Sequence, residues 1–234
     1  MLEIYFVVLI ILIIGLFIAG TSYGRLIKTY QKYNTRAYVN ITAGQFVLGA
    51  LDYLNLPDHK IAISEKPLSD AYIINKKVIV ISRQNFESKT ISAISVSAHE
   101  IGHIMQQMSG SRLFAISYLF QVLSRVADIF LFPSLLVGGG LILFSQNYLE
   151  LGNIIFFVGI GFYIITLLLK LITIPLEFNA SKRALFLLKS ERILDDDELK
   201  GAKKVLRAAA FTYVGSLFYN LLRLIRGISR SFED

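Results

Sequence analysis

Three long blocks of apolar residues without a charged side chain divide the sequence. They cover residues 4–24, 129–149 and 151–169, and Glu150 separates the last two. A helix of about 21 residues rises about 32 Å, which is enough to cross a hydrocarbon core of roughly 30 Å. The pattern therefore predicts a transmembrane anchor at residues 1–24 and a transmembrane helical hairpin at residues 129–169.

A cleaved signal peptide is the alternative interpretation of the first block. Signal peptides begin with basic residues, whereas this block is preceded by Glu3 and followed by Arg25 and Lys28. Basic residues on the cytoplasmic side of an apolar block are typical of a membrane anchor. We therefore predict that the block is retained.

Short segments rich in β-branched residues lie between the first two blocks. Lys60–Ser64 and Lys77–Ser82 have this composition, and Asn75-Lys76 is a turn signal between Ala71–Ile74 and Val78–Ile81. These features predict a small β-hairpin or sheet. The edge of such a sheet can receive an extended peptide as an added strand; a purely structural sheet that covers a helix fits the pattern equally well.

A helix is predicted directly after these strands. Thr90 suits the N-cap position, Ile91 to Met108 is helix-compatible throughout, and Gly110 is a stop signal. This helix carries two of the three histidines in the chain.

The last apolar stretch, Val205–Ile225, has an uncharged core of 15 residues between Arg207 and Arg223, which is short for a membrane span. We predict an amphipathic helix that lies on the membrane or packs in the domain core. The acidic run Asp195–Glu198 directly precedes this pattern, and lysines follow it one turn later. It is interpreted as a solvated helix N-terminus and not as a metal cluster.

Composition and charge agree with a membrane protein. Hydrophobic residues make up 54% of the 234 residues, charged residues make up 18%, and the net charge is +7. All 24 Lys and Arg residues lie in segments 25–128 and 170–234, with 12 in each. By the positive-inside rule both segments face the cytoplasm, and the turn at Glu150 faces outside. Topology thus explains the positive charge, and no basic stripe or known module indicates nucleic-acid binding.

The absence of cysteine limits the chemistry of the chain. It excludes disulfide frameworks, zinc ribbons, iron–sulfur clusters and thiol nucleophiles. Any metal ion must therefore be bound by His, Asp or Glu.

The predicted helix contains the sequence H-E-x-x-H. His99 and His103 are four residues apart, so both imidazoles lie on one helix face and can bind the same divalent ion. Glu100 is then placed beside the ion, where a carboxylate can take a proton from a metal-bound water. The alternative is a chance match, which is rare in a chain with only three histidines.

Such a site needs a third protein ligand. His59 follows Pro57-Asp58, a polar turn signal, and is interpreted as a solvated loop residue. Glu177 is the better candidate because it follows the third apolar block by about two helical turns, and Pro175 predicts a new helix start there. Two membrane crossings separate His103 from Glu177, so both lie on the same side of the membrane and can meet.

Four segments carry a resemblance to a known family. They are similar to segments of the bacterial membrane-bound neutral zinc metallopeptidases of the YugP-like type, and more distantly of the HtpX type. These segments are Leu68–Tyr72, Ser92–His103, Leu176–Ala184 and Val205–Tyr213. The resemblance covers most of the chain from residue 60 onward.

The resemblance implies a zinc ion bound by His99, His103 and Glu177, with Glu100 as the catalytic base. This chain departs from the usual E-F-D-A-S of the family at Asn179. It departs from the usual D-H-Y-D stretch at Ala71 and Ile73. The departures affect the surroundings of the site and leave the metal ligands complete.

Two further roles are expected near the metal. A second donor to the oxyanion of the tetrahedral intermediate is usually required, and the candidates are Tyr72, Tyr213 and Arg183. Ser181 is four residues after Glu177 and faces the same way. Its hydroxyl either hydrogen-bonds a ligand histidine or lies on the helix surface.

These features predict a mainly α integral membrane protein with a small β-hairpin or sheet and a zincin-like catalytic region on about three transmembrane helices. The expected parts are an anchor (1–24), a cytoplasmic zincin-like region (25–128), a helical hairpin (129–169) and a cytoplasmic region with the third ligand (170–234). We expect a multi-pass protein of the cytoplasmic membrane that acts as a zinc-dependent endopeptidase. Its expected partners are the lipid bilayer and a peptide or membrane-protein substrate.

Two alternatives remain at this stage. In the first, the active site lies within the bilayer, but the polar residues Ser92, Ser95, Ser97 and Gln106 of the motif helix favour the aqueous side. In the second, the chain is a non-catalytic membrane scaffold or chaperone subunit with a structural zinc ion.

Overall fold

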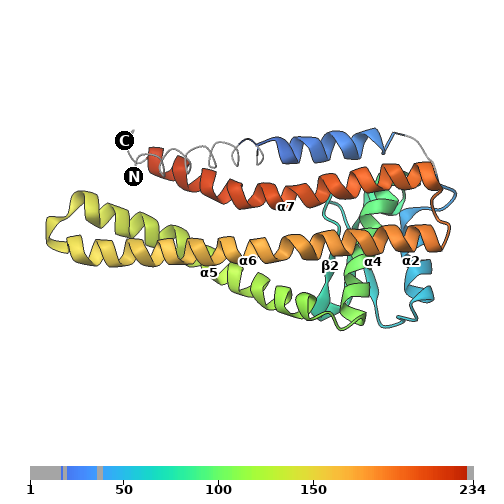
Figure 1. The fold of residues 1–234 in the computed structure, drawn as a ribbon, viewed down its shortest axis with the longest axis horizontal. Coiled ribbons are helices and arrows are strands. Elements are labelled where there is room, and N and C mark those ends of the chain that lie inside the picture. The colour runs from blue at the N-terminus through green and yellow to red at the C-terminus, as the bar shows by residue number, and fades with distance from the viewer. Residues whose placement is uncertain (1–16, 18–19, 36–38, 231–234) are drawn as a thin grey trace. The chain divides into compact units, whose positions relative to one another are not determined.

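The computed structural model describes residue 17, residues 20–35 and residues 39–230. Most of the predicted anchor lies outside this part of the chain, and residues 20–32 are helical. The described part is mostly helical with one small sheet, as predicted (Figure 1). The helices are α2 (Ala43–Tyr53), η1 (Ile74–Lys76), α3 (Arg83–Phe86), α4 (Ile91–Met108), α5 (Arg112–Phe144), η2 (Gln146–Tyr148), α6 (Leu149–Ser190) and α7 (Asp196–Arg230).

Contacts divide the chain into two compact units. The first contains the described residues up to Ser111 together with those from Glu177 onward. The second is Arg112–Leu176. The first unit is therefore formed by two separate stretches of sequence.

The first unit contains a three-stranded sheet with the order β1-β3-β2. The central strand β3 (Val78–Ser82) is parallel to β1 (Lys60–Ser64) and antiparallel to β2 (Ala71–Ile73). Ile79 and Ile81 of β3 are fully buried, because a β-branched side chain on the inner face of a strand packs well against helices. The predicted sheet is confirmed, and β2 lies at one of its edges.

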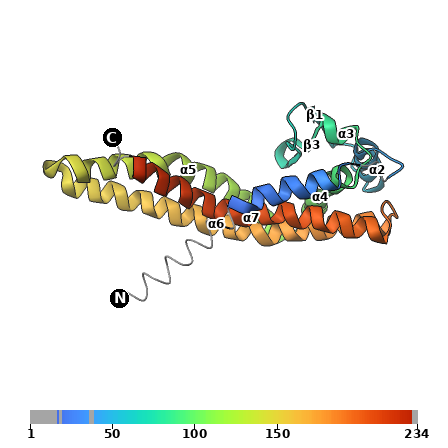
Figure 2. The same ribbon diagram turned by 90° about the horizontal axis from the view of Figure 1, so that it is seen from above.

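Helix α4 lies at the centre of this unit. It begins after the predicted N-cap, Thr90, whose hydroxyl accepts a hydrogen bond from the N–H of Ala93. The sheet and α2 lie on one side of α4, and α7 with the C-terminal part of α6 lies on the other (Figure 2). Ile94 and Ile101 of α4 are fully buried in the core that these elements share. The helix that carries the two histidines is thus fixed by packing on both sides.

Helix α6 runs through Pro175 without a break. The predicted new helix start at Pro175 is therefore wrong. A proline removes one backbone hydrogen bond from a helix. Here the following turns are fixed by the burial of Ala180, Ala184 and Leu188 in the core of the first unit. Tertiary packing thus outweighs the local preference for a helix end.

Helix α7 confirms the interpretation of the acidic run. The Asp195 carboxylate accepts hydrogen bonds from the N–H groups of Asp197 and Glu198, as a residue at a helix N-terminus does. Further along α7, Leu206 is buried in the core cluster, and its neighbour Val205 is fully buried as well. The first part of the stretch 205–225 therefore packs in the domain core, which was one of the two predicted alternatives.

The second unit contains the predicted helical hairpin. Val122–Phe144 and Gln146–Ser190 are long and apolar enough to cross a membrane. Only 22% and 19% of the residues in their most apolar windows are buried, and Phe144 is 83% exposed. Apolar surface of this extent is typical of a surface that contacts a membrane or another protein. The two helices approach each other closely at Gly138, where an added Cβ would lie 2.4 Å from the backbone nitrogen of Phe156.

A glycine also allows α4 and α6 to approach each other in the first unit. A Cβ atom added to Gly102 would lie 2.4 Å from the carbonyl oxygen of Ala180. We expect Gly102→Ala to push the two helices apart and to lower the free energy of unfolding by about 1–3 kcal/mol. Thermal or denaturant unfolding of the full chain in detergent measures this effect.

Gly49→Ala is the matched control for this substitution. Gly49 lies on α2, and an added Cβ there meets no atom within 4 Å. Alanine is the better helix former, so this variant should gain about 0.5–1 kcal/mol. Equal stability of the two variants would contradict the close approach of α4 and α6.

Candidate metal centre

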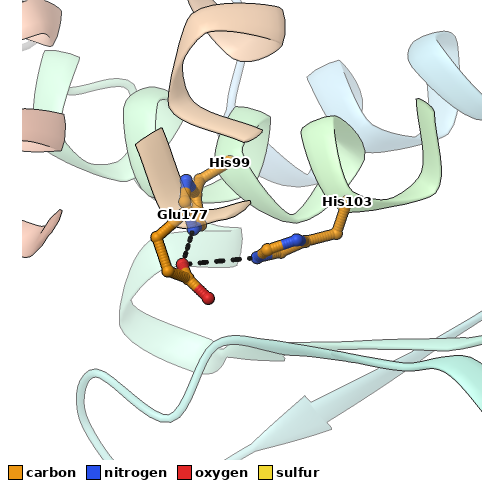
Figure 3. A group of neighbouring side chains, drawn as sticks. All are labelled: His99, His103 and Glu177. Atoms are coloured by element: carbon orange, nitrogen blue, oxygen red, sulfur yellow. Dashed lines mark hydrogen bonds and ion pairs between the residues drawn. The ribbon is translucent and has the colours of Figure 1, made fainter. Parts of the chain in front are cut away.

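The H-E-x-x-H segment lies on α4, and α6 brings Glu177 to it. The imidazole ring centroids of His99 and His103 are 4.7 Å apart, and the Glu177 carboxylate points toward both rings (Figure 3). The Oε2 atom of Glu177 is 3.0 Å from Nε2 of His99 and 3.6 Å from Nε2 of His103. One potential ligand atom from each residue lies within 4.8 Å of the others, so a single ion could contact all three. The structure thus brings together the three residues predicted as ligands.

The centre is largely shielded from water. The side chains of His99 and His103 are 12% and 15% exposed, and that of Glu177 is 5% exposed. A buried carboxylate is stable only when it is paired or binds a cation. Burial alone would raise the pKa of Glu177, but hydrogen bonds from His103 and His99 outweigh burial and lower the pKa to about 2. The carboxylate is therefore ionised, as a metal ligand must be.

Each histidine also contacts a second polar side chain through its Nδ1 atom. Nδ1 of His99 lies 3.2 Å from Oγ of Ser181. Nδ1 of His103 lies 3.0 Å from Oε1 of Gln106. Such contacts orient a ligand histidine and leave its Nε2 atom directed at the ion. The predicted contact between Ser181 and a ligand histidine is confirmed.

Gln106 is itself oriented by α6. Its amide Nε2 donates to Oδ1 of Asn179 at 3.0 Å, and the same oxygen accepts a hydrogen bond from Nε of Arg183 at 2.9 Å. Because the amide nitrogen of Gln106 faces Asn179, its oxygen must face His103 and accept the proton of Nδ1. Arginine can only donate, so Arg183 sets the direction of the whole chain of hydrogen bonds. This chain ends at His103 and assigns Nε2 to the metal side.

Glu100 is buried beside the two histidines and is not part of the ligand group. Its carboxylate lies near the backbone N–H of Tyr72 in strand β2. Burial raises the pKa of Glu100, and the two neighbouring histidines counteract part of this rise. The edge strand of the sheet therefore lies next to the carboxyl group that the sequence predicts as the catalytic base.

Of the three candidates for an oxyanion donor, only Tyr213 has its polar group at the metal centre. Its side chain is 39% exposed overall, but its hydroxyl hydrogen-bonds Glu177, and the local desolvation of the hydroxyl together with the charges of Glu177 and Glu100 raises its pKa well above the usual value. Arg183 donates to Asn179, to the carbonyl of Met105 and to Ser109.

The third candidate, Tyr72, uses its hydroxyl elsewhere. The hydroxyl contacts Oε1 of Gln107 at 2.7 Å and Nε2 of His59 at 3.1 Å. His59 lies in a loop, as predicted, but it is half-buried against the Tyr72 ring and not fully solvated. A polar turn signal describes the backbone at His59, but it carries no information about the aromatic ring that covers the imidazole.

Sequence reasoning missed two positioning groups, the Gln106 side chain and the backbone N–H of Tyr72. Gln106 has a weak local signal, because a residue three positions after His103 on a helix lies on the same face. The N–H of Tyr72 has none, because every residue except proline carries one.

Comparisons with known proteins agree with this geometry. The family described as "Putative neutral zinc metallopeptidase" matches residues 5–231. The chain is also 34% identical over 201 residues to a protein of Bacillus subtilis (strain 168) named "Putative membrane protease YugP", with 85% of each chain covered. No solved structure matches.

The chain therefore belongs to the neutral zinc metallopeptidase family. Its donor set suits zinc, because two imidazole nitrogens and one carboxylate are a usual three-ligand set for a catalytic zinc ion. The family and the geometry of the site therefore both indicate zinc.

We expect Gln106→Ala to weaken zinc binding by about 10- to 100-fold, because His103 loses the acceptor that orients its ring. The matched control is Gln107→Ala. Gln107 is its neighbour on α4, but its side chain contacts Tyr72 and neither histidine. Competition with a chelating dye measures the zinc affinity of both proteins. Equal affinities would show that the orientation of His103 does not depend on Gln106.

Proposed function

We propose that this member of the neutral zinc metallopeptidase family is a membrane-bound, zinc-dependent endopeptidase. In this proposal His99, His103 and Glu177 hold the zinc ion and Glu100 is the general base. The main support is the meeting of a carboxylate from α6 with two imidazoles from α4, beside a second carboxyl group that is not in the ligand group. Three protein ligands favour an open, catalytic site over a closed structural one, which argues against a zinc-bearing scaffold.

Each residue has a defined part in the proposed reaction. Zinc, when bound, supplies a Lewis acid that lowers the pKa of a water molecule to about 7. Glu100 accepts a proton as the water attacks the peptide carbonyl, and it later gives this proton to the leaving amine. Ser181 and Gln106 keep the two imidazoles in position throughout.

Tyr213 is the proposed second donor to the oxyanion. Its hydroxyl is already at the centre, where it contacts Glu177. A preorganised donor at this position stabilises the charge that develops on the carbonyl oxygen. The other two candidates use their hydroxyl or guanidinium groups elsewhere.

Strand β2 is the proposed docking edge for the peptide. It is an edge strand, and the backbone N–H of Tyr72 lies near the Glu100 carboxylate, which supports an edge next to the site. A peptide that adds to the edge would form main-chain hydrogen bonds, which accept many sequences.

We place the metal centre on the cytoplasmic side, close to the membrane surface. Helix α6 has 42 residues and is roughly 63 Å long, about twice the thickness of a hydrocarbon core. Its uncharged part ends at Leu169, and Glu177 follows about 12 Å further along the helix. Such a position favours peptides and membrane proteins at the bilayer surface as substrates.

Glu100→Gln should retain about one zinc ion per chain and lose peptide cleavage. Glutamine has nearly the same shape but cannot accept the proton from water. Zinc content is measured by atomic emission, and cleavage is measured with a quenched fluorescent peptide library. Cleavage by Glu100→Gln at the parental rate would refute the proposed base.

Glu177→Ala serves as the contrasting variant in the same experiment. It removes a ligand and should lose both zinc and cleavage. Zinc binding by both the parent and the Glu100→Gln protein, with cleavage by neither, would favour a scaffold over an enzyme.

The topology can be tested with single cysteines, because the chain has none of its own. Asn147→Cys lies in the turn of the hairpin and should react with a membrane-impermeant maleimide added to intact cells. Ser190→Cys at the end of α6 should react only after the cells are opened. Reaction in the opposite order would reverse the proposed orientation.

A further inference from the structure

A cavity of about 170 Å³ opens beside the metal centre within the first unit. His99, Glu100 and Tyr213 form part of its wall. A group in this cavity therefore lies directly next to the groups that the proposed reaction uses. The cavity is close enough to receive a side chain that neighbours the bond to be cleaved.

Most of the remaining wall is apolar. It is built from Leu26 of the helix 20–32, Leu68 of the loop between β1 and β2, Val96 of α4, and Leu206 and Ala209 of α7. An apolar cavity of roughly 150 Å³ in a protein can hold a benzene ring. The size and the lining thus suit a leucine or phenylalanine side chain.

The one other ionisable carboxylate in this wall, Asp70, is already engaged. Its oxygens accept hydrogen bonds from the backbone N–H and the hydroxyl of Ser82, each at 3.2 Å, and from the amide of Asn85 at 2.9 Å. Tyr30, also in the wall, donates its hydroxyl to the same Asn85. The described residues of the wall include no Lys or Arg. This charge distribution favours an apolar guest over an acidic one, and it leaves Asp70 with little capacity for a basic one.

Leu68 has a backbone conformation that a leucine rarely adopts. Its φ angle is 52°, in the left-handed region where a bulky side chain is strained. Strain of this kind persists only where the surrounding structure imposes it, and it is concentrated at functional sites. Here the strained turn places a leucine, and not a glycine, in the wall of the cavity.

We propose that this cavity is a specificity pocket that binds an apolar side chain of leucine or phenylalanine size next to the scissile bond. The inference rests on the proposed function and adds the class of substrate to it. Ala209 and Leu68 are the residues that set the size of the pocket.

The test uses the full chain in detergent and a set of peptides that are identical except at one position beside the cleaved bond. This position carries Gly, Ala, Leu, Phe, Trp, Asp or Lys. The parent should cleave the Leu and Phe peptides with a kcat/KM about 10- to 100-fold above that of the Gly peptide. Ala209→Leu fills the pocket and should shift the preference to Gly and Ala.

Ala208→Leu is the matched control, because Ala208 is the neighbour of Ala209 on α7 and does not line the cavity. It should keep the parental preference. Leu68→Gly is a second variant that relieves the strained φ angle, so it should fold. It removes one wall and should reduce the discrimination between Phe and larger side chains. An unchanged preference in both Ala209→Leu and Leu68→Gly would overturn the proposal, as would a parental preference for Lys or Asp.

Binding to the Glu100→Gln protein separates the pocket from the proposed catalysis. Its affinities for the same peptides, labelled and measured by fluorescence anisotropy, should follow the order Leu and Phe above Ala and Gly. One outcome would support the pocket and refute the proposed function. In this outcome the parent cleaves no peptide, the expected order of affinities holds, and Ala209→Leu in the Glu100→Gln background reverses that order. Cleavage by the parent with no order among the peptides would overturn the pocket alone.

Discussion

The close approach of α4 and α6 at Gly102 is the constraint on which the centre depends. The backbone of α6 at Ala180 occupies the space that a side chain of residue 102 would fill. At this separation Glu177, one turn earlier on α6, reaches both histidines, and Ser181 reaches the back of His99. A wider spacing of the two helices would leave the buried Glu177 carboxylate without partners. The free-energy cost of an unpaired buried charge is far larger than that of the lost helix packing. Gly102, which lies between the two histidines in the sequence, therefore determines whether the Glu177 carboxylate can reach both imidazoles.

The groups around the metal site come from separate elements, and each element fixes a different atom. Helix α4 supplies both imidazoles, α6 supplies the third candidate ligand, and β2 brings a backbone N–H close to Glu100. Asn179 also fits this arrangement. Its Oδ1 atom accepts hydrogen bonds from both Gln106 and Arg183. It is therefore the acceptor that orients Gln106.

Local patterns in the sequence predicted much of this structure because they depend on neighbouring residues. The N-cap at Thr90, the strands around Ile79 and the spacing of His99 and His103 are of this kind. Features that depend on distant contacts were missed or predicted wrongly. Pro175 does not end a helix because the core holds the turns that follow it, and His59 packs against Tyr72 of β2. Glu177 could be proposed from its position about two helical turns after the third apolar block, and the predicted hairpin would return the chain to the side of His103; neither argument needs contact information.

The arrangement of β2 and the cavity separates two tasks in the proposed recognition of a peptide. An edge strand contributes main-chain hydrogen bonds, which are almost independent of sequence. The cavity beside Glu100 contributes apolar contacts. The binding free energy from these contacts differs between a glycine and a phenylalanine peptide by the full transfer free energy of the phenylalanine side chain. Discrimination therefore falls to Leu68 and Ala209, while β2 keeps the backbone of any extended peptide in register with Glu100. Because the N–H of Tyr72 lies near Glu100, binding of a peptide at this edge and the surroundings of the proposed base involve the same strand.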